Sequence, residues 1–223
     1  MTTIFLDRDG VINENRPDYV KSWSEFRFLP GAREAIAKLT RAGHRIVVCT
    51  NQAGVARGCL STKTIDEIHQ RMLAHIVEAG GRVEKVYYCP HSKDERCLCR
   101  KPRPGMLLRA RQELSLDLTN AVFVGDSITD IRAGLAAGVQ AILVLTGLGV
   151  DQLCNHYHEA SGPFFVTTNL YHAAEVILQG FQDRSAKQLV PLSAGLSLPN
   201  RHHEEAFALS SVHRKSLAGE LSL

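Results

Sequence analysis

Ile4-Phe5-Leu6-Asp7-Arg8-Asp9-Gly10-Val11, close to the N-terminus, combines a short apolar run with two acidic residues. Three consecutive apolar residues that lead into an acid are typical of a fully buried parallel strand. Open α/β folds keep their chemistry at the carboxyl edge of such strands, so we expect Asp7 there. Asp9 follows two positions later, and two carboxylates so close repel each other unless a divalent cation or a shared proton lies between them. The stretch therefore suggests a Mg²⁺ site, although an isolated Asp-x-Asp-Gly more often only ends a strand in a turn.

Strands and helices alternate along the rest of the chain. Apolar runs predict strands at 4–6, 45–50, 83–88, 121–125 and 141–145, and helical periodicity marks 29–43, 62–79, 107–114 and 128–137. This alternation predicts an α/β fold with a doubly wound, Rossmann-like parallel sheet.

Polar residues follow three of these predicted strands. Asp7 ends the first, Thr50-Asn51-Gln52 the second and Gly125-Asp126-Ser127 the fourth. Asp126 could simply cap the helix that follows it. Convergence of Asp126 on Asp7 would instead supply the oxygen ligands that Mg²⁺ prefers, and Asp130 would face the same side of the helix start.

A second group of candidate ligands lies between residues 89 and 101. Three cysteines and one histidine form two C-x-[HC] pairs that suit a closed, structural zinc site: Cys89, His91, Cys97 and Cys99. Iron, another soft metal or simply free cysteines are the alternatives. A bound zinc would fix Arg100 and Lys101, which directly follow the last cysteine, at the mouth of the site.

Composition limits the classes of partner. The chain has 223 residues, of which 44% are hydrophobic and 22% are charged, enough for one buried core but not for two large domains. The net charge of +3 and the lack of basic blocks argue against nucleic acid and against membrane surfaces. No apolar run reaches membrane-spanning length and no cleavable leader precedes the first strand. We therefore predict a cytoplasmic monomer that acts on a small molecule.

The domain boundary is placed near residue 182. We predict a catalytic domain over 1–182 and a flexible C-terminal tail over 183–223, where a Ser-, Leu- and Pro-containing sequence lacks sustained periodicity beyond a short helix near Ala206. His202 and His203 lie in this tail without a further ligand at a familiar spacing, so we predict no metal site there.

Four motifs together resemble those of the haloacid dehalogenase (HAD) superfamily of phosphatases, over roughly residues 3 to 150. They are Asp7-Arg8-Asp9-Gly10, Thr50-Asn51-Gln52, Lys101-Pro102 and Gly125-Asp126-x-x-x-Asp130. The resemblance implies that Asp7 attacks phosphorus to form an aspartyl-phosphate and that Asp9 protonates the leaving oxygen and later deprotonates water. Thr50 and Lys101 would hold the phosphoryl group. The residues between motifs leave no room for a large cap domain.

The resemblance also implies the ligands and the metal. Mg²⁺ would be bound by Asp7, Asp9 and Asp126, and zinc by the three cysteines and His91. If the chain is still extended at Arg8, its side chain should point away from both neighbouring acids.

Within the superfamily, Cys-Pro-His paired with Cys-x-Cys-Arg-Lys-Pro, and Thr-Asn-Gln-Ala-Gly-Val-Ala-Arg-Gly at 50–58, resemble the branch that acts on heptose bisphosphates or on histidinol phosphate. The resemblance implies a Mg²⁺-dependent phosphomonoesterase that removes the 7-phosphate of a heptose 1,7-bisphosphate. Histidinol phosphate or another small sugar phosphate is the alternative substrate. A catalytically idle protein that binds sugar phosphate, or that uses the zinc loop for interaction, is the alternative of a different class. The implied substrate contacts are Asn51, Gln52, Ala53, Arg100 and Tyr19.

Overall fold

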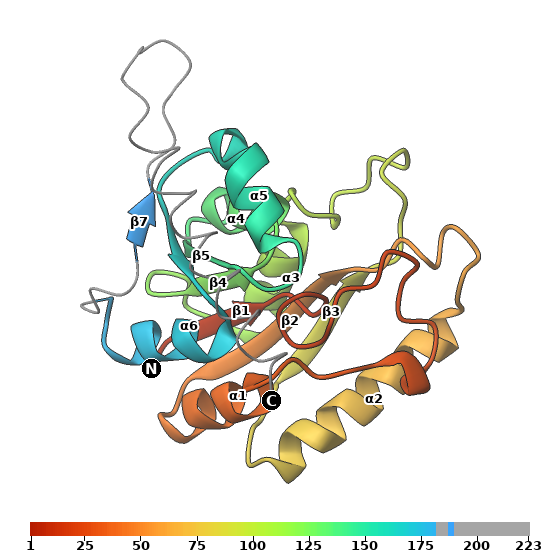
Figure 1. Cartoon of the computed structure of the whole chain (residues 1–223), viewed down its shortest axis with the longest axis horizontal. Helices are drawn as coiled ribbons and strands as arrows, with labels where there is room; N and C mark the ends of the chain where they lie inside the picture. The colour runs from red at the N-terminus through yellow and green to blue at the C-terminus, as the bar shows by residue number, and fades with distance from the viewer. Residues whose placement is uncertain (182–186, 190–223) are drawn as a thin grey trace, which may run out of the picture.

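Seven strands form one sheet in the computed structural model, which describes residues 1–181 and 187–189 (Figure 1). Their order across the sheet is β3-β2-β1-β4-β5-β6-β7. The first six are parallel, and only β7 runs antiparallel to its neighbour β6. The strands are β1 (Thr3–Leu6), β2 (Arg45–Asn51), β3 (Lys85–Cys89), β4 (Val122–Gly125), β5 (Gln140–Val144), β6 (Phe164–Thr167) and β7 (Lys187–Leu189).

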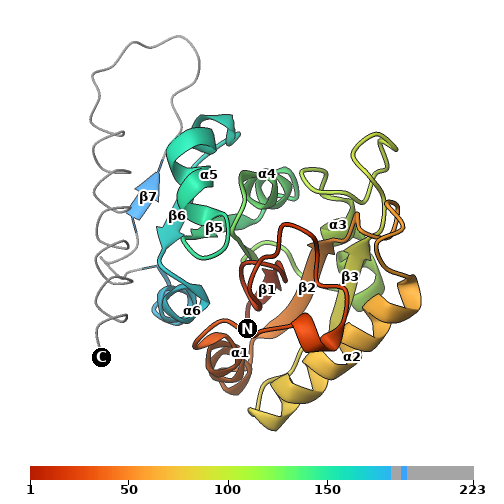
Figure 2. The same cartoon turned by 45° about the vertical axis from the view of Figure 1, so that its right-hand side comes forward.

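Helices cover both faces of this sheet (Figure 2). One face carries α1 (Ala32–Arg41), α2 (Thr62–Glu78) and α6 (Leu170–Leu178), and the other carries α3 (Gly105–Leu114), α4 (Ile128–Ala136) and α5 (Gly149–His156). Two short 3₁₀ turns, η1 (Trp23–Glu25) and η2 (Tyr157–Glu159), complete the described elements. Trp23 of η1 stacks on His75 of α2, with 5.1 Å between the ring centroids, and on Phe26, with 5.0 Å. The stack with His75 attaches the loop after β1 to that helix.

Burial on both faces explains why the central strands are continuous apolar runs. Ile4 and Leu6 of β1 face the layer of α1, α2 and α6, whereas Phe5 faces the layer of α3. Phe5 meets Phe123 of β4 edge to face, with ring centroids 6.3 Å apart. Each such side chain contributes roughly 1.5–3 kcal/mol through burial, so β1 is anchored from both sides.

The predicted α/β class and the doubly wound parallel sheet are confirmed. No element was predicted over 149–178, where the structure places α5, β6 and α6. In the described part of the chain, the connections after β1, β2 and β3 contain α1, α2 and α3 together with loops and η1, and no large cap domain. None of the described helices is long and apolar enough to span a membrane.

The predicted tail at 183–223 lies outside the described residues except for β7, which pairs with β6 from Phe164↔Leu189 to Val166↔Lys187. The boundary near residue 182 and the flexible tail stay predictions. The short helix near Ala206 and the pair His202 and His203 lie outside the described residues.

The strand order places the candidate site. The chain moves from β1 to β2 on one side of the sheet, and later from β3 across to β4 on the other side of β1. Such a reversal opens a crevice at the carboxyl ends of the strands on either side of it. The residues that follow β1, β2 and β4 therefore meet at one place.

Candidate active site

Three buried carboxylates meet at the carboxyl ends of β1 and β4. Asp7 follows β1, Asp126 follows β4 and Asp130 lies in the first turn of α4, and one oxygen from each lies within 4.8 Å of the other two. Ser127, rather than Asp126, caps α4, because its hydroxyl accepts from the Thr129 N–H while Asp130 accepts from the Ser127 N–H at 3.1 Å. Asp126 is therefore free of the capping role and turns toward Asp7.

Two glycines allow the backbone to approach Asp126. A Cβ atom at Gly147 would lie 2.1 Å from Asp126 Oδ2 and 2.5 Å from the Cα of Gly10. A Cβ at Gly10, whose φ is +82°, would lie 1.9 Å from the same Oδ2. Any larger residue at either position would displace this carboxylate. Asp126 Oδ2 is further fixed by the Leu148 N–H, which donates to it at 2.8 Å.

Lys101 provides the positive charge of the cluster. Its Nζ lies 2.8 Å from Asp7 Oδ1 and 2.6 Å from Asp130 Oδ1, and it donates to the Cys49 carbonyl at 3.0 Å. The side chain is only 1% exposed. Burial acts to lower the pKa of Lys101, but the charges of Asp130 and Asp7 outweigh it and raise the pKa above its ordinary value. Lys101 is thus an ammonium ion at neutral pH.

Even with this lysine the cluster is short of positive charge. Burial raises the pKa of Asp7 to about 6, against the lowering effect of Lys101 and with the help of Asp130. Burial, Asp130 and Asp7 raise the pKa of Asp126 well above its ordinary value. Three carboxylates facing one ammonium in a buried place are the donor set and the charge balance that suit a hard divalent cation such as Mg²⁺. The residues therefore fit the predicted ion.

Asp9 lies in a different environment, although it is only two residues from Asp7. Its carboxylate accepts from the Arg8 guanidinium at 2.9–3.3 Å, from Asn13 Nδ2 at 2.8 Å and from Gln52 Nε2 at 2.7 Å. Burial acts to raise the pKa of Asp9, but the Arg8 charge and the hydrogen bonds from Asn13, Gln52 and Arg8 together lower it.

The predicted direction of Arg8 needs correction here. Arg8 was expected to point away from both acids, but the chain turns at Gly10 and Arg8 pairs with Asp9 through Nη2 and Nε. Asp9 was predicted to be a Mg²⁺ ligand, and this stays a prediction: its carboxylate is bonded to these donors and lies outside the acid cluster. Asp130, which was expected to face the same side of the helix start, belongs to the cluster.

A pocket of about 180 Å³ lies above the acid cluster. Among the predicted site residues it is lined by Asp7, Asp9, Tyr19, Thr50, Asn51, Lys101 and Asp126. Gln52 and Ala53 are buried and do not line it. Gln52 instead bridges two lining residues, since its Nε2 donates to Asp9 Oδ2 and, at 2.9 Å, to Thr50 Oγ1.

Asn51 and Tyr19 fix the walls of this pocket. Asn51 holds the backbone of Lys101 at both ends, accepting from its N–H at 3.1 Å and donating to its carbonyl at 3.2 Å. Tyr19 adopts a left-handed conformation with φ 67° and packs against Gly54, while the Arg57 guanidinium lies 5.9 Å from its ring centroid. The loop after β1 is thereby attached to the loop after β2.

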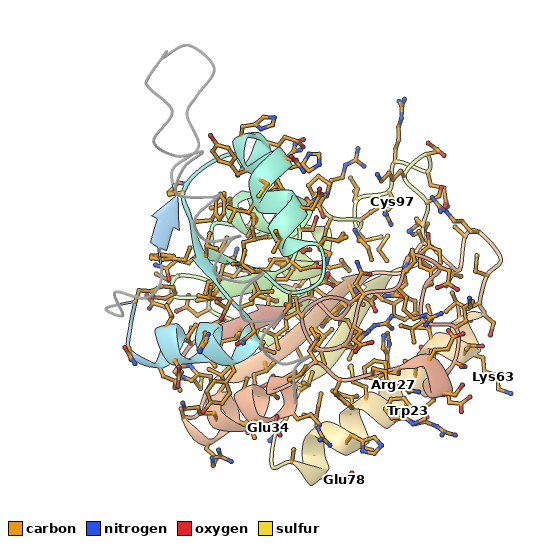
Figure 3. All side chains as sticks on the ribbon, in the orientation of Figure 1. Trp23, Arg27, Glu34, Lys63, Glu78 and Cys97 are labelled. Atoms are coloured by element: carbon orange, nitrogen blue, oxygen red, sulfur yellow. The ribbon has the colours of Figure 1, made fainter. Side chains whose placement is uncertain are left out.

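The four predicted zinc ligands come together in the loop between β3 and α3, where Figure 3 shows Cys97 beyond the end of the strand. Five of the distances among the three Sγ atoms and His91 Nδ1 are 3.3–3.5 Å. Corners about 2.3 Å from a tetrahedral zinc ion lie roughly 3.8 Å apart, so this set of four soft donors fits such an ion after a small expansion.

A second, larger cleft of about 710 Å³ adjoins the pocket above the acid cluster. Asn51, Lys101 and Leu148 line both. Cationic residues dominate its remaining lining, namely Lys93, Arg96, Arg100, Arg103 and Arg132, whereas Glu159 is its one carboxylate among the lining residues. Arg100 donates to the His91 carbonyl at 3.1 Å and is thereby attached to the Cys/His loop. The side chain of Arg132, half-buried on α4, makes no hydrogen bond or ion pair with any described residue, although its charge helps to lower the pKa of Glu159. The cleft is suited to an anionic group.

Several residues of the site were not singled out from the sequence. Asn13 is fully buried in the turn after β1. Arg132 of α4, Leu148 just before α5 and Gln152 of α5 line the cleft. Asn13 has a recognisable signal in the sequence, because it is a polar residue that directly follows the apolar pair Val11 and Ile12. Leu148 and Gln152 depend on α5, for which no element was predicted, whereas Arg132 lies within the helix predicted over 128–137, where its contact with the cleft gives no sequence signal.

Comparison with known proteins is consistent with this geometry. A family model described as HAD-hydrolase-like matches residues 98–173. The D-glycero-beta-D-manno-heptose-1,7-bisphosphate 7-phosphatase of Pseudomonas putida is 46% identical over 149 residues, which are 67% of this chain and 85% of the relative. The enzyme of the same name from Neisseria meningitidis serogroup A is 38% identical over 179 residues, covering 80% of this chain and 96% of the relative.

Two solved structures of heptose bisphosphate phosphatases are similar to this chain. The D,D-heptose 1,7-bisphosphate phosphatase from B. bronchiseptica, complexed with magnesium and phosphate, superposes with a TM-score of 0.75 at 40% identity, covering 81% of this chain and 99% of that one. The corresponding protein from Burkholderia thailandensis gives a TM-score of 0.63 at 32% identity, over 80% of this chain and 99% of that one.

The raised pKa of Asp7 leads to a prediction about stability. Its ordinary pKa is 3.8 and its folded pKa is about 6, so the protonated form stabilises the fold below pH 4 and this contribution is lost as the pH rises through 6. In buffer without divalent cations, the free energy of unfolding should fall by about 1 kcal/mol between pH 5 and pH 7.5. Urea titrations at each pH measure this free energy of unfolding. Asp7→Asn should flatten this dependence, and an equal fall in both proteins would contradict the assignment.

Proposed function

The chain belongs to the family of HAD-like phosphatases that includes the D-glycero-beta-D-manno-heptose-1,7-bisphosphate 7-phosphatases, and we propose that it removes the 7-phosphate of D-glycero-D-manno-heptose 1,7-bisphosphate. The observation that carries the proposal is the pair Asp7 and Asp9, two carboxylates in opposite environments beside a buried ammonium group. Pairs of acids whose surroundings push their pKa values apart are typical of a division between two chemical roles.

Asp7 is the proposed nucleophile. A carboxylate oxygen of Asp7 attacks phosphorus, the bond from phosphorus to the sugar oxygen breaks, and an aspartyl-phosphate forms. Lys101, 2.8 Å from Asp7 Oδ1, and the hydroxyl of Thr50 are placed to hold the transferring phosphoryl group. Water then attacks phosphorus, the bond to Asp7 breaks, and inorganic phosphate leaves.

Asp9 is the proposed acid and base. Its five hydrogen bonds from Arg8, Asn13 and Gln52 favour the carboxylate, which is the form that removes a proton from water in the second step. The first step needs a proton on Asp9 for the leaving oxygen. A phosphate that enters the pocket adds negative charge next to Asp9, and this raises its pKa toward the protonated form. After it has given up this proton, Asp9 returns to the form that its neighbours stabilise.

Asp7, Asp126 and Asp130 are the residues proposed to hold Mg²⁺. The ion would supply the positive charge that offsets repulsion between the phosphate and the Asp7 carboxylate. The heptose bisphosphate phosphatase from B. bronchiseptica was solved with magnesium and phosphate, which supports this choice of ion.

The cationic cleft is proposed to receive the rest of the substrate. A bisphosphate whose 7-phosphate lies over Asp7 places its second phosphate in the neighbouring space, where Arg100 and Arg132 line the wall. Histidinol phosphate is less well matched, because its amine would meet these cations and the single lining carboxylate, Glu159. A catalytically idle binding protein would not need Asp7, Asp9 and Lys101 arranged as they are. A cytoplasmic location and a monomeric state stay predictions.

The Cys/His loop is proposed to bind a structural zinc ion through Cys89, His91, Cys97 and Cys99. This set leaves no open position for water, so the ion would act on the fold of the loop and not on the substrate. Arg100 and Lys101 follow Cys99 directly, so an ordered loop fixes one residue of the cleft and one of the acid cluster.

The proposed reaction is tested by phosphate release from D-glycero-D-manno-heptose 1,7-bisphosphate, histidinol phosphate and fructose bisphosphate in the presence of Mg²⁺. We expect the heptose bisphosphate to have the highest kcat/KM. Asp7→Asn, which is nearly isosteric, should abolish turnover and leave the circular dichroism spectrum unchanged. Preference for histidinol phosphate would overturn the substrate, and turnover near the parent rate in Asp7→Asn would overturn the nucleophile.

The role of the cleft predicts a split between two substrates. Arg132→Gln should lower kcat/KM for the 1,7-bisphosphate by about tenfold or more, since a hydrogen bond to a charged group contributes about 1.5–3 kcal/mol. The effect on the 7-monophosphate, which lacks the second anionic group, should be below about twofold. Arg109→Gln, an exposed arginine on α3 outside the cleft, is the control. Equal losses on both substrates would contradict this role.

The zinc proposal predicts about one zinc ion per purified chain. Cys97→Ser should remove it and lower kcat, by up to on the order of a hundredfold, because a positioning error of about an ångström at Lys101 and Arg100 suffices for such a loss. Elemental analysis and steady-state kinetics measure both effects, and Cys154→Ser, outside the cluster, is the matched control. A zinc-free parent, or a Cys97→Ser enzyme with parental kinetics, would exclude the proposal.

A further inference from the structure

Arg8 is the largest of the side chains that are almost completely buried, with 1% of its surface exposed. A guanidinium cannot lose its proton inside the protein, and its donors need acceptors when they are buried. Nε and Nη2 of Arg8 donate to the carboxylate of Asp9. Its remaining nitrogen, Nη1, has one partner among the described residues, His69 Nε2 at 3.0 Å.

His69 interrupts the apolar stripe of helix α2. Its neighbours on the buried side are Ile65, Ile68, Met72 and Ile76, and His69 itself is 5% exposed. An apolar residue at this position would complete the stripe, so helix packing alone does not account for a histidine there. The sequence motifs of the site lie in other segments, and none of them includes α2.

The contact with Arg8 determines which nitrogen of His69 carries the proton. Arg8 Nη1 can only donate, so His69 Nε2 accepts and the proton of the neutral ring is on Nδ1. Burial and the Arg8 charge keep the ring neutral, since they lower the pKa of His69 to about 3. A protonated ring would have no lone pair for the guanidinium.

We infer that His69 is a positioning residue for the proposed acid and base: it fixes Arg8 from behind, and Arg8 then fixes the carboxylate of Asp9. The inference rests on the role proposed above for Asp9. Asn13 and Gln52 hold the same carboxylate from other segments, so three elements of the fold determine its direction. Loss of the acceptor at residue 69 would leave a buried N–H unpaired and allow Arg8, and with it Asp9, to shift.

Two amide variants separate positioning from packing. His69→Gln offers an acceptor at about the distance of Nε2, whereas the side chain of His69→Asn is one carbon shorter and does not reach Arg8. We expect His69→Gln to keep kcat within about threefold of the parent and His69→Asn to lower it about ten- to hundredfold, with KM nearly unchanged in both. His172→Asn, at an exposed position of α6, is the control. Equal kcat for the Gln and Asn variants would overturn the inference.

The route through Asp9 is tested by a double-mutant cycle. In an Asp9→Asn background, His69→Asn should cause no further loss, because the group that it positions is already gone. A loss by the same factor in both backgrounds would show that His69 acts by another route and would overturn the inference. Residual turnover of Asp9→Asn is followed with p-nitrophenyl phosphate at high enzyme concentration.

A readout that needs no substrate keeps the inference separate from the proposed function. Imidazole ¹⁵N NMR of the labelled full chain should show His69 neutral at pH 7 with its proton on Nδ1. A proton on Nε2 would overturn the inference whatever the enzyme hydrolyses. A parent protein with this tautomer but without activity on the heptose bisphosphate would refute the proposed substrate and leave the contact between His69 and Arg8 in place.

Discussion

The ammonium group of Lys101, buried between Asp7 and Asp130, holds together parts of the chain that are far apart in sequence. A lysine removed from water is costly unless carboxylates and hydrogen bonds surround it, and here two carboxylates and the Cys49 carbonyl do so. The dependence is mutual, because without the ammonium group the three acids of the cluster would face only one another. β1, β2, α4 and the loop after β3 each contribute one of these groups, so the position of Lys101 depends on all four segments.

Asp7 and Asp9 show how one turn produces two chemical environments. In an extended chain both side chains would lie on one side of the strand, with Arg8 on the other. The chain instead turns at Gly10, which has a positive φ, so that Asp9 faces Arg8, Asn13 and Gln52 while Asp7 faces Lys101 and the other acids. The pKa of Asp7 is raised and that of Asp9 is lowered, although only Arg8 separates them in the sequence.

The sequence predicts the elements whose burial is simple and misses what depends on turns. The predicted strands at 4–6, 45–50, 121–125 and 141–145 are apolar runs buried on both faces, and their parallel pairing follows from the alternation with helices. The segment 149–178 was passed over, although Asn169 is an N-cap before an apolar helix and Phe164 to Val166 form an apolar run. Periodicity gives no information on the direction of Arg8, because this depends on where the strand ends. The pairing of Arg8 with His69 joins residues 61 positions apart, and only the tertiary structure reveals it.

The site has two parts: a rigid floor, formed by Asp7, Asp126 and Asp130, and a rim, formed by the loop between β3 and α3. Asp7, Asp126 and Asp130 stand at the ends of two central strands and in the first turn of α4, where packing on both faces of the sheet limits their movement. Arg100 and the exposed cations of the cleft belong to a loop without helix or strand, and the Cys/His cluster is its main internal attachment. Sequence changes in this rim can alter which anionic group is accepted without disturbing the groups that act on phosphorus. Lys101 belongs to both parts, because its backbone continues the rim while its ammonium group lies among the acids of the floor. Asn51 joins the two parts, since it hydrogen-bonds both the N–H and the carbonyl of Lys101.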